Sequence, residues 1–138
     1  MIERLPDWET RLAAYLEPLM AGARFEWGQL DCALFAADAV LAMSGHDIAA
    51  PFRGKYSTAA GSARALKRYG AGDLKSTFDT LLPPRPVGYA RRGDVVMSDG
   101  AVGVCMGAFA LFIGIEADAD GIYRCPRAEW TYAWGVGP

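Results

Sequence analysis

Residues 25–35 read Phe25-Glu26-Trp27-Gly28-Gln29-Leu30-Asp31-Cys32-Ala33-Leu34-Phe35. Asp31 is a favoured N-cap residue, and residues 32–44 are apolar almost all round before Gly45, which predicts a central helix that begins at Cys32. A helix N-terminus offers unpaired N–H groups and a partial positive charge, and both favour a thiolate over a thiol. Cys32 is therefore a candidate nucleophile. Asp31 is its helix cap, and we expect Asp31→Ala to cost about 1 kcal/mol of stability through loss of that cap.

The first half of the chain, about residues 7–82, reads as helices. Asp7 can cap a first helix, in which apolar residues recur at helical spacing over residues 8–19. Pro18 is expected to kink or end that helix, because proline lacks the backbone N–H that a helix interior needs.

Two further helices precede a change to strands. Ser57 or Thr58 is expected to cap a third helix that ends at about Tyr69, and a short fourth helix is expected at about 73–82. The sheet half, about 93–136, then contains five candidate strands: 93–97, 101–106, 109–115, 122–125 and 132–136. Helices first and strands second predict an α+β domain, in which N-terminal helices pack on a small antiparallel sheet whose strands pair through short turns.

Length and charge limit the classes of function. The chain of 138 residues fits a single domain (1–138), and a net charge of −2 without a basic stripe argues against nucleic acid as a partner. The N-terminus lacks a secretory signal pattern, and the longest apolar run, 101–115, falls short of the about 20 residues that span a bilayer. We expect a protein made in the cytoplasm, without membrane insertion or a cofactor, and a location in a virion stays open.

The three cysteines, Cys32, Cys105 and Cys125, are too few for a disulfide scaffold. Cys105 and Cys125 could pair if their strands are neighbours, although reduced core residues are favoured. Asp118 and Asp120 suggest a calcium loop, but the further ligands of such a loop are missing from the sequence, so a turn is favoured.

Three motifs together carry a resemblance to a known family. They are the aromatic-x-Trp-Gly turn with Asp-Cys in residues 25–35, then Gly93-Asp94-Val95-Val96, then Ala101-Val102-Gly103-Val104-Cys105-Met106-Gly107. On these motifs the chain resembles the NlpC-type cell-wall cysteine peptidases over about residues 20–136, and more closely their small uncharacterised relatives from phage and prophage tail regions. The resemblance implies a papain-like fold, with Cys32 as the nucleophile on a helix and its partners on the antiparallel sheet that follows.

The departures from the family pattern fall on the chemistry. Ala101 stands at the position of the catalytic histidine, and nothing polar stands near Gly114, where the residue that orients the histidine is expected. Phe25 replaces a tyrosine that helps to bind the oxyanion. The only histidine, His46, lies at the far end of the helix that begins at Cys32, about 20 Å away. Contact within one subunit is therefore excluded, a surface loop position is favoured, and only a second subunit could bring this imidazole close.

Other side chains have both a functional and a structural interpretation. Trp27, with Phe25, could form the wall of a substrate groove beside the thiol, although aromatic residues are more often core. Asp94 and Asp99 could act as surrogate bases, although both stand in turn sequences. Cationic loop residues could meet an anionic ligand, although solvated charge is the default for them: Arg53, Lys55, Arg91 and Arg92.

Two functions are compatible with these observations. In the first, the protein is an active, phage-tail-associated cysteine hydrolase that cleaves peptide bonds of peptidoglycan. Cys32 would be the nucleophile, its own N–H would help to hold the oxyanion, and the base would be non-standard. In the second, it is a catalytically silent relative, a structural or binding piece of a phage tail whose partners are tail proteins or peptidoglycan. Loss of a triad member typically costs several orders of magnitude in rate, so Ala101 favours the second.

Overall fold

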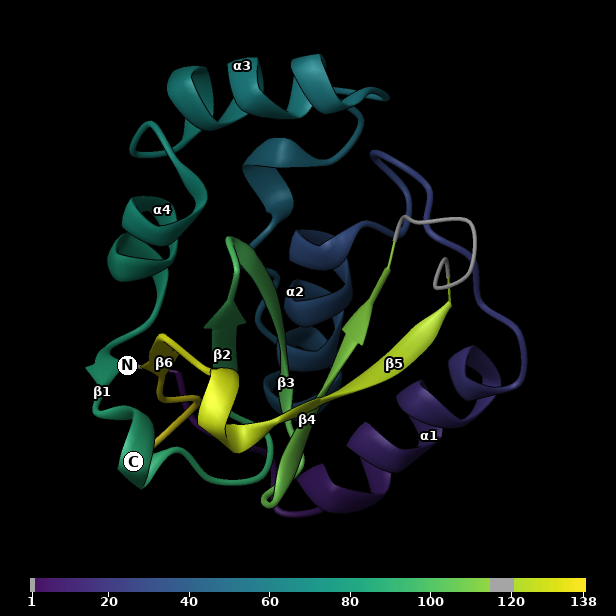
Figure 1. Cartoon of the computed structure of the whole chain (residues 1–138), viewed down its shortest axis with the longest axis vertical. Helices are drawn as coiled ribbons and strands as arrows, with labels where there is room; N and C mark the ends of the chain where they lie inside the picture. The colour runs from purple at the N-terminus through teal and green to yellow at the C-terminus, as the bar shows by residue number, and fades with distance from the viewer. Residues whose placement is uncertain (1, 115–120) are drawn as a thin grey trace.

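The computed structural model describes residues 2–114 and 121–138. Within them the chain folds as an α+β structure of four α-helices and a six-stranded antiparallel sheet (Figure 1). The helices are α1 (Trp8–Met20), α2 (Cys32–Ser44), α3 (Ala59–Tyr69) and α4 (Leu74–Leu81). The strands are β1 (Pro84–Arg85), β2 (Val95–Ser98), β3 (Ala101–Cys105), β4 (Phe109–Ile113), β5 (Ile122–Pro126) and β6 (Tyr132–Trp134), in the order β1-β6-β2-β3-β4-β5 across the sheet. The α+β class and the antiparallel sheet are confirmed.

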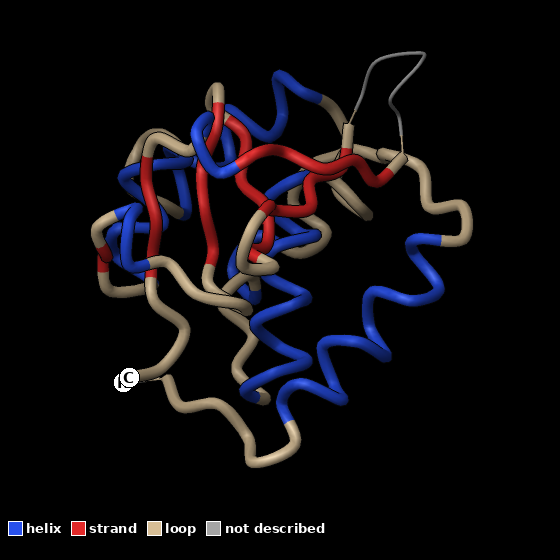
Figure 2. The backbone as a smooth tube through the Cα atoms, turned by 60° about the horizontal axis from the view of Figure 1, so that its bottom comes forward, coloured by secondary structure: helices blue, strands red, loops and turns tan. Residues whose placement is uncertain are grey.

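Helix α2 lies between the sheet and α1. It packs against β3 and β4 on one side and against α1 on the other (Figures 1 and 2). Eight of its thirteen residues are buried, which explains why its sequence is apolar almost all round. The sheet presents Val102, Val104 and Leu111 to this helical layer, while its opposite face carries a smaller cluster around Phe112 and Trp130.

The expected ends of α2 and α3 are confirmed. The Asp31 carboxylate accepts a hydrogen bond from the Leu34 N–H at 2.9 Å at the start of α2, and Gly45 ends this helix with a left-handed φ of 78°. Thr58 Oγ1 accepts from the Gly61 N–H at 2.9 Å and caps α3. These signals act over three or four residues, so the local sequence is sufficient to predict them.

Helix α1 departs from the expectation at both ends. Asp7 makes no side-chain cap, because its carboxylate accepts instead from Arg11 Nε at 2.8 Å, one turn further along. Pro18 does not end the helix, because it lies inside α1, which continues for two more residues to Met20. Proline removes a single helical hydrogen bond, and the helix ends two residues after it.

The last strand does not pair with the strand before it. β6 inserts between β1 and β2, and Ala133 stands opposite Val96, whereas pairing of successive strands through short turns was the expectation. The two-residue β1, which no pattern predicts, forms the outer edge through the pair Pro84–Trp134. Both contacts join segments far apart in the chain, and period-2 patterning contains no information on which strand becomes the neighbour.

Asp94 holds this returning segment in place. Its fully buried carboxylate accepts from Arg4 Nη2 at 3.0 Å and from Arg85 Nη1 at 2.8 Å. It also accepts from the backbone N–H groups of Arg91 and Val136, at 3.0 and 3.1 Å. One side chain therefore ties together the N-terminal segment, β1 and the residues after β6. The turn position predicted for Asp94 is confirmed, and its oxygens are fully engaged, so it is no free base.

Cys105 and Cys125 do not form a disulfide. Both thiols are free and buried, and they stand on β3 and β5, on either side of Ala110 in β4. Two strand spacings of about 4.8 Å separate their backbones, which exceeds the reach of a disulfide. The condition for pairing, that their strands are neighbours, is not met, so both cysteines are core residues.

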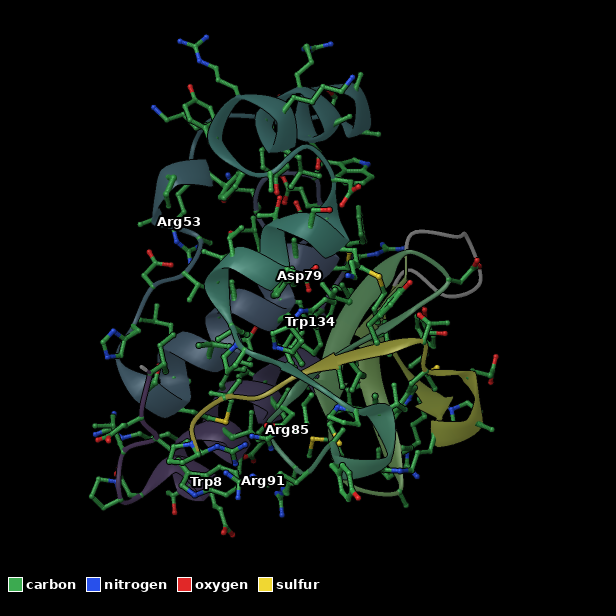
Figure 3. All side chains as sticks on the ribbon, turned by 90° about the vertical axis from the view of Figure 1, so that its left-hand side faces the viewer. Trp8, Arg53, Asp79, Arg85, Arg91 and Trp134 are labelled. Carbon is green, nitrogen blue, oxygen red and sulfur yellow. The ribbon has the colours of Figure 1, made fainter. Side chains whose placement is uncertain are left out.

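Helix α4 is fixed to the sheet by a polar contact. Trp134 of β6 is fully buried, and its Nε1–H donates to Asp79 Oδ1 at 2.9 Å (Figure 3). Lys75 Nζ pairs with the other Asp79 oxygen at 2.7 Å, and the Phe78 ring packs on the indole at a centroid distance of 5.3 Å. Helix α3 differs, because Ala65 is its only buried residue and it lies at one end of the molecule (Figure 1).

Candidate functional site

A groove of about 490 Å³ lies over the N-terminal end of α2. The turn before α2, the β2–β3 hairpin and the end of β4 form its walls. The pairing between β3 and β4 covers Val104–Leu111 and Cys105–Ala110, and the groove opens beyond these pairs. Its lining residues are Phe25, Trp27, Cys32, Ser98, Asp99, Gly100, Ala101, Ile113, Gly114 and Tyr123.

The Cys32 thiol borders the groove at the first residue of α2. Its pKa is raised, because burial disfavours the thiolate more than any other effect. Hydrogen bonds from the Val102, Ala33 and Cys32 backbone amides lower the pKa, while the negative charge of Asp31 raises it. The helix N-terminus thus acts in the expected direction, while desolvation opposes it and has the larger effect on the pKa.

Asp31 fastens the start of α2 to two other segments. Besides capping Leu34, its buried carboxylate accepts from the Gly28 N–H at 3.1 Å and from the Tyr56 hydroxyl at 2.5 Å. Burial and the bond to Asp31 raise the pKa of Tyr56, so this hydroxyl stays protonated and donates. Sequence analysis missed this role of Tyr56, because the loop that holds it lies 25 residues away with no local signal.

Gly28 is required by the same contact. Its φ is 81°, and a Cβ on this residue would lie 2.1 Å from the Tyr56 carbonyl oxygen. A side chain at this position therefore meets both backbone strain and a steric clash. The Trp-Gly pair of the motif lets the turn lie against the Tyr56 loop, and this close approach sets where the Asp31 carboxylate and the thiol stand.

The strands opposite the thiol carry no base at the expected positions. Ala101 and Gly114 both border the groove, and continuing the β3–β4 register from Val104 opposite Leu111 sets them opposite each other. The structure therefore gathers Cys32 and both expected partner positions at one groove. The Ala101 methyl also packs against the cluster on the face of the sheet away from α2, so it offers the thiol neither a proton acceptor nor a hydrogen bond.

The described polar lining of the groove comes from the hairpin and from β5. Ser98 Oγ donates to the Glu129 carbonyl at 2.9 Å, and Tyr123 stands on β5. Asp99 lies at the exposed tip of the hairpin with a φ of 50°, a conformation that aspartate tolerates in turns. The hairpin position predicted for Asp99 is confirmed. Among the described residues that line the groove, Asp99 is the one that carries a carboxylate.

A protein-family model matches nearly the whole chain. Residues 3–136 match the family described as a domain of unknown function (DUF6950). The chain belongs to the DUF6950 family. The match spans every residue of the groove lining. No curated protein and no solved structure matches the chain.

In this DUF6950 domain the histidine is not part of the groove. His46 is exposed just beyond Gly45, at the opposite end of α2 from Cys32. Because α2 is a continuous helix of thirteen residues, about 20 Å separates its two ends. The surface position predicted for His46 is confirmed.

Two of the aromatic residues flank the thiol, and others belong to the core. The Phe25 and Trp27 rings meet edge to face with centroids 4.9 Å apart, and both line the groove. Trp130 and Trp134 are buried in the two clusters of the domain. The groove wall expected at Trp27 and Phe25 therefore exists, while the structural interpretation holds for the two tryptophans near the C-terminal end.

The cationic loop residues have different surroundings. Arg53 is held by Asp38 at 2.5 Å and by Asp47 at 2.9 Å, which raises the pKa of the guanidinium. Arg91 and Arg92 line a shallow, open surface beside Trp8. None of these residues borders the groove at Cys32.

The described residues also bear on metal binding and on membrane insertion. Within residues 2–114 and 121–138, no group of three His, Cys, Asp or Glu side chains could hold a metal ion. Asp118 and Asp120, considered as a calcium loop, lie outside the described residues. No helix of the described part is long and apolar enough to cross a membrane.

Proposed function

We propose that this DUF6950 domain is a catalytically silent relative of the NlpC-type cell-wall peptidases and serves as a structural or binding component of a phage or prophage tail. The groove over Cys32 carries the proposal. At the two strand positions where a base and its orienting residue are needed, it presents the methyl group of Ala101 and the backbone of Gly114.

The chemistry of the thiol supports the absence of catalysis. A cysteine nucleophile needs an adjacent base or a lowered pKa, and burial raises the pKa of Cys32. No imidazole of the described residues borders the groove. Removal of a triad member typically lowers the rate by several orders of magnitude, so peptide hydrolysis by this groove would be very slow.

The shape of the groove supports binding. Its volume of about 490 Å³ lies in the range of ligand sites, and the Phe25–Trp27 pair supplies a rigid aromatic wall. Such a wall suits a short peptide or glycan, which by resemblance would be a segment of peptidoglycan or of a neighbouring tail protein. The association with phage tails rests on the resemblance alone.

One observation favours the alternative of an active hydrolase. The backbone amides of Val102, Ala33 and Cys32 lower the pKa of the thiol, and N–H groups near a nucleophile could also hold an oxyanion. Asp99 would then have to act as the base, directly or through water, from the tip of the hairpin.

The rate of Cys32 alkylation against pH tests whether the site is silent. We expect little reaction at neutral pH and a rate that rises only above the ordinary thiol pKa of about 8.5, because the thiol is stabilised in its neutral form. The Cys32→Ala variant gives the background from Cys105 and Cys125, which are buried. A Cys32-dependent rate with an apparent pKa well below 8.5 would instead support the hydrolase.

Sedimentation with purified peptidoglycan sacculi tests binding. We expect the wild type and Cys32→Ala to bind equally and to release no soluble peptides. Prolonged alkylation with a bulky thiol reagent at alkaline pH, where the thiolate forms, fills the groove through Cys32. After return to neutral pH, this treatment should abolish binding by the wild type and leave the treated Cys32→Ala variant unchanged. Peptide release that Cys32→Ala loses would establish the hydrolase. Loss of sacculus binding in the untreated Cys32→Ala variant would contradict a purely binding role.

A further inference from the structure

Positive charge is concentrated around α3. Residues 48–72 contain five Lys or Arg residues and no Asp or Glu. The whole chain has 14 Lys or Arg residues and 16 Asp or Glu residues. Outside residues 48–72 there are therefore nine cationic and sixteen acidic residues, a net charge of −7. Because α3 lies at one end of the molecule (Figures 1 and 3), this positive charge is gathered at that end.

Most of this charge is not neutralised within the protein. Arg53 pairs with Asp38 and Asp47. The other four cations of this segment have no ion pair with any carboxylate in the described part of the chain: Lys55, Arg64, Lys67 and Arg68.

Three of these four cations converge on one hollow. Lys55, Arg64 and Arg68 line a depression of about 590 Å³ between α3 and the loop before it. Arg64 and Arg68 stand one turn apart on the same face of α3, a spacing at which like charges repel. Lys55 Nζ and Arg68 Cζ lie 5.6 and 5.5 Å from the centroid of the Tyr69 ring, so both cations contact the same aromatic side chain. Lys67 does not line the hollow.

We propose that this hollow, lined by Lys55, Arg64 and Arg68, is a binding site for a compact ligand of the oligophosphate or phosphate-ester class. Three unpaired cations call for a ligand with at least two negative charges, which a single carboxylate cannot supply. Two guanidinium groups match phosphate oxygens through forked hydrogen bonds, and a lysine adds a mobile point charge. The hydroxyls of Ser57 and Thr58 border the same hollow.

The shape of the site favours a compact ligand over a nucleic acid duplex. A duplex is normally met by a basic stripe or face, whereas these cations surround one depression of ligand size. The hollow shares no lining residue with the groove at Cys32. The proposal therefore stands or fails independently of the function assigned to that groove.

Calorimetric titration with sodium tripolyphosphate tests the proposal on the full chain. We expect saturable binding at low ionic strength that weakens as salt is added. Arg64→Gln and Arg68→Gln should each weaken binding about tenfold, the usual effect of losing one charge-assisted contact. Lys67→Gln is the matched control, since it removes one charge from the same helix outside the hollow, and it should change affinity less than twofold. Tripolyphosphate should also raise the melting temperature of the wild type and of Lys67→Gln.

Four results would overturn the proposal. One is the lack of saturable binding by wild type, and another is an equal loss in Lys67→Gln, which would indicate diffuse attraction. A third is equally tight binding of a tricarboxylate of matched charge, which would exclude a preference for phosphate. The fourth is competition by duplex DNA that strengthens with duplex length, which would assign the surface to nucleic acid. Circular dichroism of each variant shows whether α3 is still folded.

Discussion

The Tyr56 hydroxyl donates to the Asp31 carboxylate at 2.5 Å, and this bond ties the loop before α3 to the cap of the helix that holds Cys32. A hydrogen bond to a charged group contributes about 1.5–3 kcal/mol. We therefore expect Tyr56→Phe to lower the free energy of unfolding by about that amount in urea titrations. Tyr89→Phe is the control, because Tyr89 is 76% exposed. Equal stability of the two variants would mean that the Tyr56–Asp31 bond adds nothing.

Asp31→Ala should be more destabilising than loss of a helix cap alone. The cap by itself predicts about 1 kcal/mol. The carboxylate also accepts from the Gly28 N–H and the Tyr56 hydroxyl, and its removal leaves these partly buried donors without their partner, so we expect a total of about 2–4 kcal/mol. In a double-mutant cycle with Tyr56→Phe, the two losses should be less than additive. Strict additivity would contradict a shared network.

Gly28→Ala should separate steric clash from backbone strain. Gly28 and Gly54 have similar positive φ values, 81° and 74°, but a Cβ would lie 2.1 Å from Tyr56 O at Gly28 and meet nothing within 4 Å at Gly54. Gly54→Ala should cost only the left-handed strain of about 1–2 kcal/mol. Gly28→Ala should cost clearly more and should also change Cys32 alkylation. If both variants lose the same stability in urea, the close approach of the turn to Tyr56 is not required.

Asp94→Asn should unfold the protein more readily than any exposed carboxylate change. It leaves the Arg4 and Arg85 guanidinium groups without their counter-charge, and their side chains are only 9% and 21% exposed. Removal of one partner from a buried ion pair costs about 3–5 kcal/mol. Asp99→Asn, at an exposed hairpin tip, should stay within about 0.5 kcal/mol. Unfolding of both variants in guanidinium chloride measures this difference. A small loss of unfolding free energy for Asp94→Asn would show that the groups that donate to Asp94 find other partners.

Stability should decrease at alkaline pH because the fold raises the pKa of two thiols. Burial raises the folded-state pKa of Cys32 and Cys105, so the unfolded chain loses these protons first as the pH rises. The contribution to stability is complete below the unfolded thiol pKa of about 8.5 and is lost as the pH rises toward the folded values. Cys32→Ala should show a shallower decrease between neutral and alkaline pH in urea titrations. An identical slope in both proteins would mean that the Cys32 pKa is not raised.

The sequence alone determined the parts of the fold that depend on neighbours within one helical turn. Asp31 and Gly45 set the two ends of α2, and Thr58 set the start of α3. Capping, left-handed glycine and helical periodicity act over three or four residues. The sequence also showed that the expected base position is occupied by Ala101. The only histidine stands 14 positions after Cys32, at the far end of the same helix.

Only the tertiary structure decided what depends on segments far apart in the chain. It brought Tyr56 into hydrogen-bond contact with Asp31, and Arg4 and Val136 into hydrogen-bond contact with Asp94. It also set β6 beside β2 in the sheet. It also decided the sign of the Cys32 pKa shift, because the helix amides are a local property whereas desolvation depends on how the whole fold covers the sulfur. Which polar groups meet, and which thiol is covered, follows from packing that no short-range pattern encodes.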